Sequence, residues 1–173
     1  MLTTQASVTM KGKPLSLTGN EVEVGQRAPQ FTAVDNDMKD ASLADFSGRV
    51  LIINSVPSLD TAVCSKETHR FNEEADHLGS DIKVLTISMD LPFAQKRWCG
   101  AEGIKNVVTL SDYRDASFGQ AYGVLIKELR LLARAVMVVD AGGVIRYRQL
   151  VPEITQEPNY EAALKAARDL VKK

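Results

Sequence analysis

A short apolar run followed by a loop and a long helical segment constrains the fold more than any other part of the chain. Residues 49–54 form a brief, β-branched, apolar run, which predicts a buried strand. Residues 65–78 are rich in helix formers and contain neither Gly nor Pro, which predicts a helix. A second apolar run at 82–88 predicts a strand beside the first. Strand, helix and strand in this order form a βαβ unit, so we expect an α/β protein with a central sheet.

The loop between this strand and this helix places a cysteine at the start of the helix. Pro57 favours an extended conformation for the residue before it, and Asp60 and Thr61 are both good N-cap residues. If Thr61 is the cap, Cys64 is the third helical residue, near free backbone N–H groups and the positive end of the helix dipole. Such a position stabilises a thiolate and would make Cys64 reactive. The alternative is that Cys64 is a small, buried apolar side chain, as free cysteines often are.

Length, charge and cysteine content argue against several classes of protein. A chain of 173 residues is expected to form a single domain, 1–173, whose core needs neither disulfides nor a structural metal. The formal net charge of −1 gives no reason to expect binding to nucleic acid or to an anionic membrane. The sequence has no apolar run long enough for a membrane span and no signal-peptide pattern, so a cytoplasmic location is expected. The two cysteines form no C-x-x-C pair, and neither His69 nor His77 joins them in a zinc-like spacing.

The remaining patterns predict a mixed sheet with helices on both faces. An N-terminal β-hairpin extension is expected within residues 1–20, with Gly12 in its turn. The other predicted elements are a strand at 31–34, a helical turn at 41–46, a helix from Pro92 that stops near Gly100, a strand at 107–110, a short helix within 112–122, a hairpin at 135–148 and a helix at 159–173. Together these elements predict an α/β fold with a mixed central sheet.

The helix that follows Cys64 carries many charged residues and two histidines. The charged residues are Lys66, Glu67, Arg70, Glu73 and Glu74. They are expected to form a solvated face rather than a charged site. A Cys–His hydrolase is disfavoured by helical geometry, because His69 is rotated by about 140° from Cys64 and His77 lies about 20 Å farther along the axis. Both histidines are therefore expected to be surface side chains.

The loop at Cys64 resembles the active-site loop of a known family. Pro57, Thr61 and Cys64 form the pattern P-x-x-x-T-x-x-C, which resembles that of peroxiredoxins. The fuller string at 58–64 is similar to the thiol peroxidase branch of that family. The match is more specific than three spaced residues alone would be.

Two further stretches extend the resemblance over nearly the whole chain. Residues 25–31 resemble the G-x-x-A-P-x-F opening of many peroxiredoxins. Residues 90–99 resemble the thiol peroxidase helix that carries the resolving cysteine, with Trp98 in place of an expected Phe. The resemblance implies a thioredoxin-like fold.

The chemistry that the resemblance implies is peroxide reduction for antioxidant defence. The Cys64 thiolate would attack hydrogen peroxide or an organic hydroperoxide, water or an alcohol would leave, and Cys64 would become a sulfenic acid. Cys99 would resolve this sulfenic acid as a disulfide within the same chain, and thioredoxin would regenerate both thiols. Neither a metal nor an organic cofactor is expected.

The resemblance also implies roles for three neighbours of Cys64. Thr61 lies three residues earlier, so its hydroxyl could reach the sulfur and the peroxide, although a capping role alone is the alternative. Pro57 would shield the site from water. Arg134, just before the strand expected from residue 135, matches the position of the family's active-site Arg, with Arg130 as the nearby alternative.

The family resemblance further implies a homodimer. Leu91, Phe93 and Trp98 supply apolar surface close to Cys99, so a twofold interface near the Cys64 loop is expected. This surface could also form an apolar approach for organic hydroperoxides.

The two cysteines are expected to meet only after a rearrangement. A disulfide requires Cα atoms about 4.4–6.8 Å apart, and two helices packed on a sheet rarely bring such positions so close. Unwinding is therefore expected at 61–65, at about 96–100, or at both.

Two other classes of function remain open on the residues alone. The first is a thioredoxin-like binding module with inert cysteines, whose thiols would react with peroxide no faster than free cysteine does. The second is a dithiol oxidoreductase acting on proteins, which the missing C-x-x-C pair disfavours.

Overall fold

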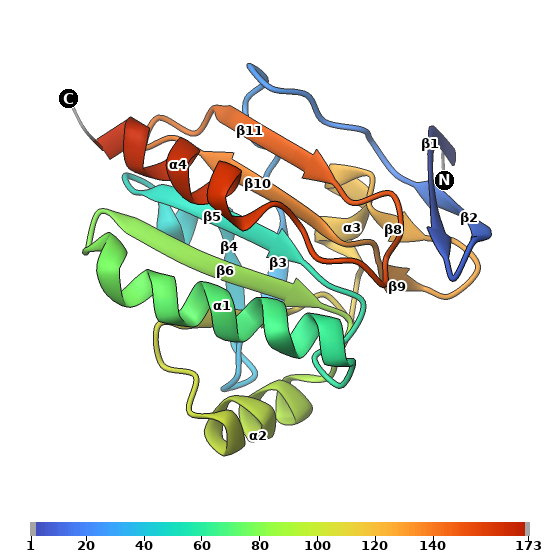
Figure 1. Ribbon diagram of the computed structural model, residues 1–173, viewed down its shortest axis with the longest axis horizontal. Coiled ribbons are helices and arrows are strands. Elements are labelled where there is room, and N and C mark those ends of the chain that lie inside the picture. The colour runs from blue at the N-terminus through green and yellow to red at the C-terminus, as the bar shows by residue number, and fades with distance from the viewer. Residues whose placement is uncertain (1–2, 172–173) are drawn as a thin grey trace.

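A mixed sheet of seven strands forms the centre of the part of the chain that the structure describes. The structure is a computed structural model that describes residues 3–171, and their side chains from residue 7 onward (Figure 1). The strands, in the order β11-β10-β5-β6-β7-β3-β4, are β3 (Thr32–Val34), β4 (Asp40–Ser42), β5 (Val50–Ser55), β6 (Ile82–Ser88), β7 (Val107–Ser111), β10 (Ala135–Val139) and β11 (Ile145–Leu150). β5, β6 and β7 run parallel, and the other pairs are antiparallel. The predicted mixed sheet is therefore confirmed.

Strand β5 lies at the middle of the sheet because it is apolar on both faces. Leu51 and Ile53 pack into one apolar cluster, and Val50 and Ile52 pack into the cluster on the opposite face. Burial on both faces is typical of a parallel strand covered by helices. Since β5 pairs in parallel with β6, the predicted βαβ unit is present.

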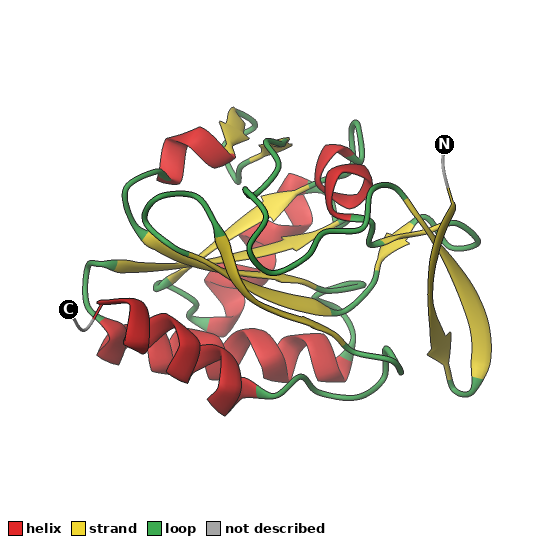
Figure 2. Cartoon of the chain, turned by 90° about the horizontal axis from the view of Figure 1, so that it is seen from above, coloured by secondary structure: helices red, strands yellow, loops and turns green. Residues whose placement is uncertain are grey.

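Helices cover both faces of the sheet, as Figure 2 shows. The helices are α1 (Ala62–Leu78), α2 (Pro92–Glu102), α3 (Ser117–Tyr122), α4 (Tyr160–Val171) and the 3₁₀ helix η1 (Leu43–Phe46). Phe71 of α1 and Leu164 of α4 are buried in one cluster, and Phe118 of α3 is buried in the other. The helix predicted to end at residue 173 is α4, and residues 172–173 lie outside the described range. No helix within residues 3–171 is both long enough and apolar enough to cross a membrane.

The N-terminal hairpin belongs to a second, smaller sheet. This sheet has the order β1-β2-β8-β9, with β1 (Thr3–Met10), β2 (Lys13–Thr18), β8 (Leu125–Ile126) and β9 (Leu131–Leu132). The hairpin predicted within 1–20 is present, although residues 1–2 lie outside the described range. β8 and β9 were not predicted, because two residues are too few to show a periodic pattern. Because β8 pairs with β2, the hairpin is attached to the segment of chain that leads to Arg134 and β10.

Two predicted boundaries were wrong. Helix α2 continues through Gly100 to Glu102 and ends at Gly103, whose φ of 69° is the left-handed conformation that ends many helices. A glycine within the last turn costs only about 1 kcal/mol, so Gly100 does not stop the helix. The helical turn predicted for 41–46 is confined to η1, because Asp40–Ser42 pairs with β3 as strand β4.

Candidate active site

Cys64 lies in the first turn of α1, as the sequence predicted. The Thr61 hydroxyl caps the helix by accepting the Cys64 N–H at 3.4 Å, and donates to the Ser58 carbonyl at 3.0 Å. Cys64 has no exposed surface and packs against Val56 and Leu59. The cap therefore fixes the backbone beneath a fully buried thiol at the positive end of α1.

Arg134 is the cation beside this thiol. Its Nη2 lies 3.1 Å from the Cys64 sulfur, and its side chain is 1% exposed. Nε and Nη2 also donate to the Ile154 carbonyl, at 3.1 and 2.8 Å, which fixes the guanidinium plane. Arg130, the alternative considered from the sequence, is exposed and has a positive φ of 52°. The structure thus brings Arg134, and not Arg130, to Cys64.

Glu67 is a third buried member of this group that sequence reasoning missed. Its Oε2 lies 3.3 Å from Arg134 Nη1, and the Glu67 side chain has no exposed surface. The prediction of a solvated face was wrong for this residue. Its position in the sequence could have indicated that it lies near Cys64. Glu67 follows Cys64 by three positions and so shares its face of the helix.

Burial keeps the Glu67 carboxyl largely protonated near neutral pH. Loss of solvation raises the pKa of Glu67 to about 8, although the charge and hydrogen bond of Arg134 partly oppose this. Among the described residues, Oε1 of Glu67 has no hydrogen-bond partner. A neutral Glu67 leaves the positive charge of Arg134 available to an anionic sulfur.

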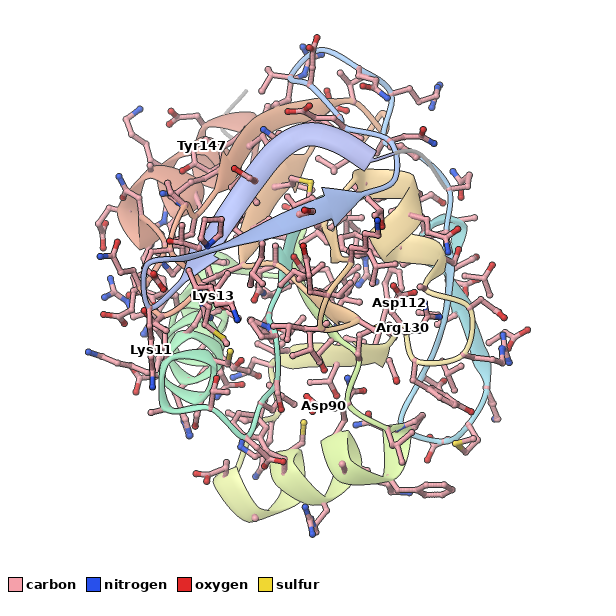
Figure 3. All side chains as sticks on the ribbon, turned by 90° about the vertical axis from the view of Figure 1, so that its right-hand side faces the viewer. Lys11, Lys13, Asp90, Asp112, Arg130 and Tyr147 are labelled. Atoms are coloured by element: carbon pink, nitrogen blue, oxygen red, sulfur yellow. The ribbon has the colours of Figure 1, made fainter. Side chains whose placement is uncertain are left out.

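An apolar cleft of about 440 Å³ is lined by Thr61 and Arg134, both of which contact Cys64. Pro57 is buried and lines this cleft together with Val63, Leu131 and Ile154. The tip of the N-terminal hairpin supplies part of the rim through Lys11, which is labelled in Figure 3. The hairpin extension is therefore part of the approach to Cys64.

Cys99 is not brought together with Cys64. It is half-buried in the last turn of α2, where its sulfur lies 3.5 Å from the Thr109 hydroxyl. Both thiols are free. Trp98, beside Cys99, packs against the buried cluster that contains Cys64, so the two regions are neighbours without a bond between the sulfurs.

The histidines that suggested a hydrolase lie toward the surface. His69 Nε2 is 3.2 Å from Glu102 Oε2, and its ring lies edge-on to Trp98 with a centroid distance of 5.7 Å. His77 is exposed. This arrangement does not pair an imidazole with Cys64 in the way that a Cys–His nucleophile requires.

Comparison with known proteins gives consistent matches over most of the chain. Residues 23–164 match the Redoxin family model. A thiol peroxidase of Bacillus subtilis is 58% identical and a thiol peroxidase of Listeria monocytogenes is 57% identical, over 96% and 93% of this chain and 99% and 97% of those proteins. A peroxiredoxin-like protein of Aquifex aeolicus is 41% identical, with a TM-score of 0.89 over 98% of this chain and 99% of that one.

A buried helix-terminal cysteine on this sheet, together with the family match, defines a thioredoxin-like redox protein. The chain belongs to the Redoxin family and, within it, to the thiol peroxidases. The predicted thioredoxin-like fold and the family resemblance are confirmed.

Proposed function

We propose that this thiol peroxidase reduces peroxides through Cys64 and resolves the product through Cys99. The observation that carries the proposal is the 3.1 Å contact between Arg134 Nη2 and the Cys64 sulfur, buried at the start of α1. Membership of the thiol peroxidases makes the protein an oxidoreductase that consumes peroxide at the expense of thiols. The geometry at Cys64 and the activity of the family together support the proposal.

The first step is attack by the Cys64 thiolate on one peroxide oxygen. The O–O bond breaks and a bond forms between sulfur and oxygen. The other oxygen leaves as hydroxide or alkoxide and takes up one proton from solvent, equivalent to the proton that Cys64 lost on ionising, to give water or an alcohol. Arg134 would stabilise the thiolate and the charge that develops on the oxygens. We propose that the Thr61 hydroxyl orients the peroxide, and that Pro57 restricts water at the site.

The second step joins the two cysteines. The Cys64 sulfenic acid would condense with the Cys99 thiol, forming one disulfide and releasing water. Because Cys64 is buried and Cys99 faces Thr109, we propose that residues 61–65, residues 96–100 or both unwind first. Thioredoxin would then reduce the disulfide and restore both thiols.

The proposal includes the substrate range, assembly and setting of the enzyme. The apolar cleft beside Cys64 would admit organic hydroperoxides as well as hydrogen peroxide. Leu91 and Phe93 are 52% and 67% exposed, and such apolar surface suits a homodimer interface. We also propose a cytoplasmic location and a single domain in which the hairpin within 1–20 is an extension.

Two single substitutions test this function. Cys64→Ser should abolish peroxide consumption while circular dichroism shows a retained fold. Cys99→Ser should still consume about one equivalent of peroxide per chain and then stop, because the sulfenic acid forms but no disulfide follows. Normal turnover by Cys64→Ser would end the proposal, and normal turnover by Cys99→Ser would remove Cys99 from it.

A further inference from the structure

The carboxylate of Asp90 joins the Cys64 loop to the start of α2. Its Oδ1 accepts the Ser58 hydroxyl at 2.6 Å, and its Oδ2 accepts the Leu59 backbone N–H at 2.8 Å. Oδ2 also accepts the Ser88 hydroxyl at 2.7 Å. Hydrogen bonds to a charged acceptor are stronger than those between neutral groups, so these contacts hold the loop firmly to β6 and α2.

These contacts lead to Cys64 through a short series of hydrogen bonds. Ser58, which donates to Asp90, accepts through its carbonyl both the hydroxyl and the backbone N–H of Thr61, at 3.0 and 3.2 Å. Thr61 in turn caps the helix at the N–H of Cys64. The position of the first turn of α1 therefore depends on a residue outside that turn.

The same carboxylate lies at the entrance of the helix that carries Cys99. Asp90 directly precedes Leu91, the N-cap of α2, and Figure 3 places it next to that helix. Gln95 in α2 donates to Ser88, at 3.0 Å, and to the Leu110 carbonyl, at 2.9 Å. The Ser111 hydroxyl donates to the Asp90 carbonyl. The Cys64 loop and α2 are thus anchored at one point.

We propose that Asp90 is a positioning residue that holds the closed, peroxide-reactive arrangement and must release the Cys64 loop before the disulfide forms. This inference rests on the proposed roles of Cys64 and Cys99. Peroxide attack uses the arrangement in which Asp90 binds Ser58 and Leu59, and disulfide formation uses the arrangement in which these bonds are broken. Asp90 thereby sets the ratio of the two populations.

The two steps need different arrangements, so weakening the contacts of Asp90 should change their rates differently. If the closed arrangement predominates, weakening the contacts tenfold raises the open population about tenfold and leaves the closed population nearly unchanged. The disulfide step should therefore become faster while peroxide attack is almost unaffected. A residue that only stabilised the fold or only assisted attack would not speed up the second step.

The test is stopped-flow kinetics of Asp90→Asn in the full chain, with hydrogen peroxide as substrate. Trp98 is the chain's only tryptophan and packs against the Cys64 cluster, so its fluorescence reports the rearrangement. Because Asn replaces one acceptor oxygen with a donor, we expect the disulfide step to accelerate about tenfold and peroxide attack to slow by less than about twofold. Mass spectrometry at high peroxide should find less sulfinic acid on Cys64, because the sulfenic acid is resolved before a second peroxide reacts.

Two further variants separate this effect from general damage. Ser58→Ala removes one of the contacts and should change the disulfide step in the same direction by a smaller factor, which tests the idea even if Asp90→Asn folds poorly. Asp60→Asn makes the same charge change on an exposed residue of the same loop and should leave both rates unchanged. The inference is overturned if Asp90→Asn and Ser58→Ala leave the disulfide step unchanged or slow it. A wild-type protein that forms no disulfide between Cys64 and Cys99 would instead overturn the proposed function.

Discussion

The two cysteines lie at opposite kinds of helix end. Cys64 is in the first turn of α1, has no exposed surface and contacts Arg134. Cys99 is in the last turn of α2 and is half-buried, and its sulfur lies 3.5 Å from the uncharged Thr109 hydroxyl. The positive end of a helix stabilises an anion, whereas the negative end does not.

On the proposed function, this difference would divide two chemical demands between the two thiols. The Cys64 region combines a helix cap and a cation, which stabilise an anionic sulfur, with complete burial, which keeps bulk solvent away from it. Gly100 lies within the last turn of α2, next to Cys99, so this end of the helix contains a weak helix former. On the proposed function, the first region would serve peroxide attack and the second would move to form the disulfide.

Arg134→Met should produce the largest change, because it removes the cation that distinguishes the surroundings of Cys64 from those of Cys99. Without the guanidinium, the rate of Cys64 oxidation should fall by about a hundredfold, because no cation then stabilises the charge on the sulfur and on the peroxide oxygens during attack. Arg134→Lys should be intermediate, because Lys keeps the charge but not the planar set of donors. Stopped-flow measurement of Cys64 oxidation by hydrogen peroxide gives this rate for each variant.

The control for this variant is Arg130→Met, which removes an exposed charge from the same segment of the chain. It should leave the oxidation rate within about twofold of wild type. Equal losses in the two variants would show that net charge, rather than contact with the sulfur, sets the reactivity of Cys64.

Glu67→Gln should change how stability depends on pH. The pKa of Glu67 is raised from an ordinary value of 4.5 to about 8 in the folded protein, so the folded state binds the proton more tightly than the unfolded state. This contribution to stability is complete below about pH 4.5 and is lost as the pH rises toward about 8. Glu67→Gln should lack this loss.

Denaturant unfolding between pH 5 and pH 8 measures the difference between the two proteins. Glu73→Gln is the matched control, because Glu73 is exposed on the same helix and should leave the pH dependence unchanged. Parallel pH profiles for wild type and Glu67→Gln would contradict a buried, protonated Glu67.

Gly100→Ala should produce the smallest change, and it acts at the Cys99 end. A Cβ at Gly100 would meet no atom within 4 Å, so Ala should stabilise the last turn of α2 by about 0.5–1 kcal/mol. The disulfide step should then slow by about two- to fivefold, with peroxide attack unchanged. Gly103→Ala should destabilise the end of α2 and speed up the disulfide step. The reason is that φ at Gly103 is 69°, a left-handed conformation that is strained for Ala.

Stopped-flow measurement of both steps in these two variants checks this prediction. If both substitutions slow the disulfide step equally, the end of α2 does not need to unwind. The rearrangement would then have to be confined to the first turn of α1.

The parts of the fold that sequence predicted correctly are those with local causes. β5 is a continuous apolar run, and α1 begins at a cap residue that the sequence displays. β8 escaped prediction because it pairs with β2, more than 100 positions away in sequence, and β9 pairs in turn with the two-residue strand β8. Long-range pairing of this kind leaves no periodic pattern in two residues.

The candidate site was predicted less completely. Cys64, Thr61 and Pro57 fall in one short segment, and the family resemblance added Arg134, whose contact with the sulfur no local pattern could give. Glu67 escaped because it stands among charged residues of α1, and only the fold decides which of them faces Arg134. Asp90 escaped because its partners, Ser58 and Leu59, belong to a different loop.

The central claim is that Cys64 reacts with peroxide and Cys99 completes the reaction within the same chain. Its most direct test is to treat the reduced protein with one equivalent of hydrogen peroxide and to map its thiols by labelling and peptide mass spectrometry. We predict a single disulfide between Cys64 and Cys99 in a chain that still runs as a monomer on a non-reducing denaturing gel. A disulfide that links two chains, or an oxidised Cys64 beside a Cys99 that still accepts the label, would contradict the account.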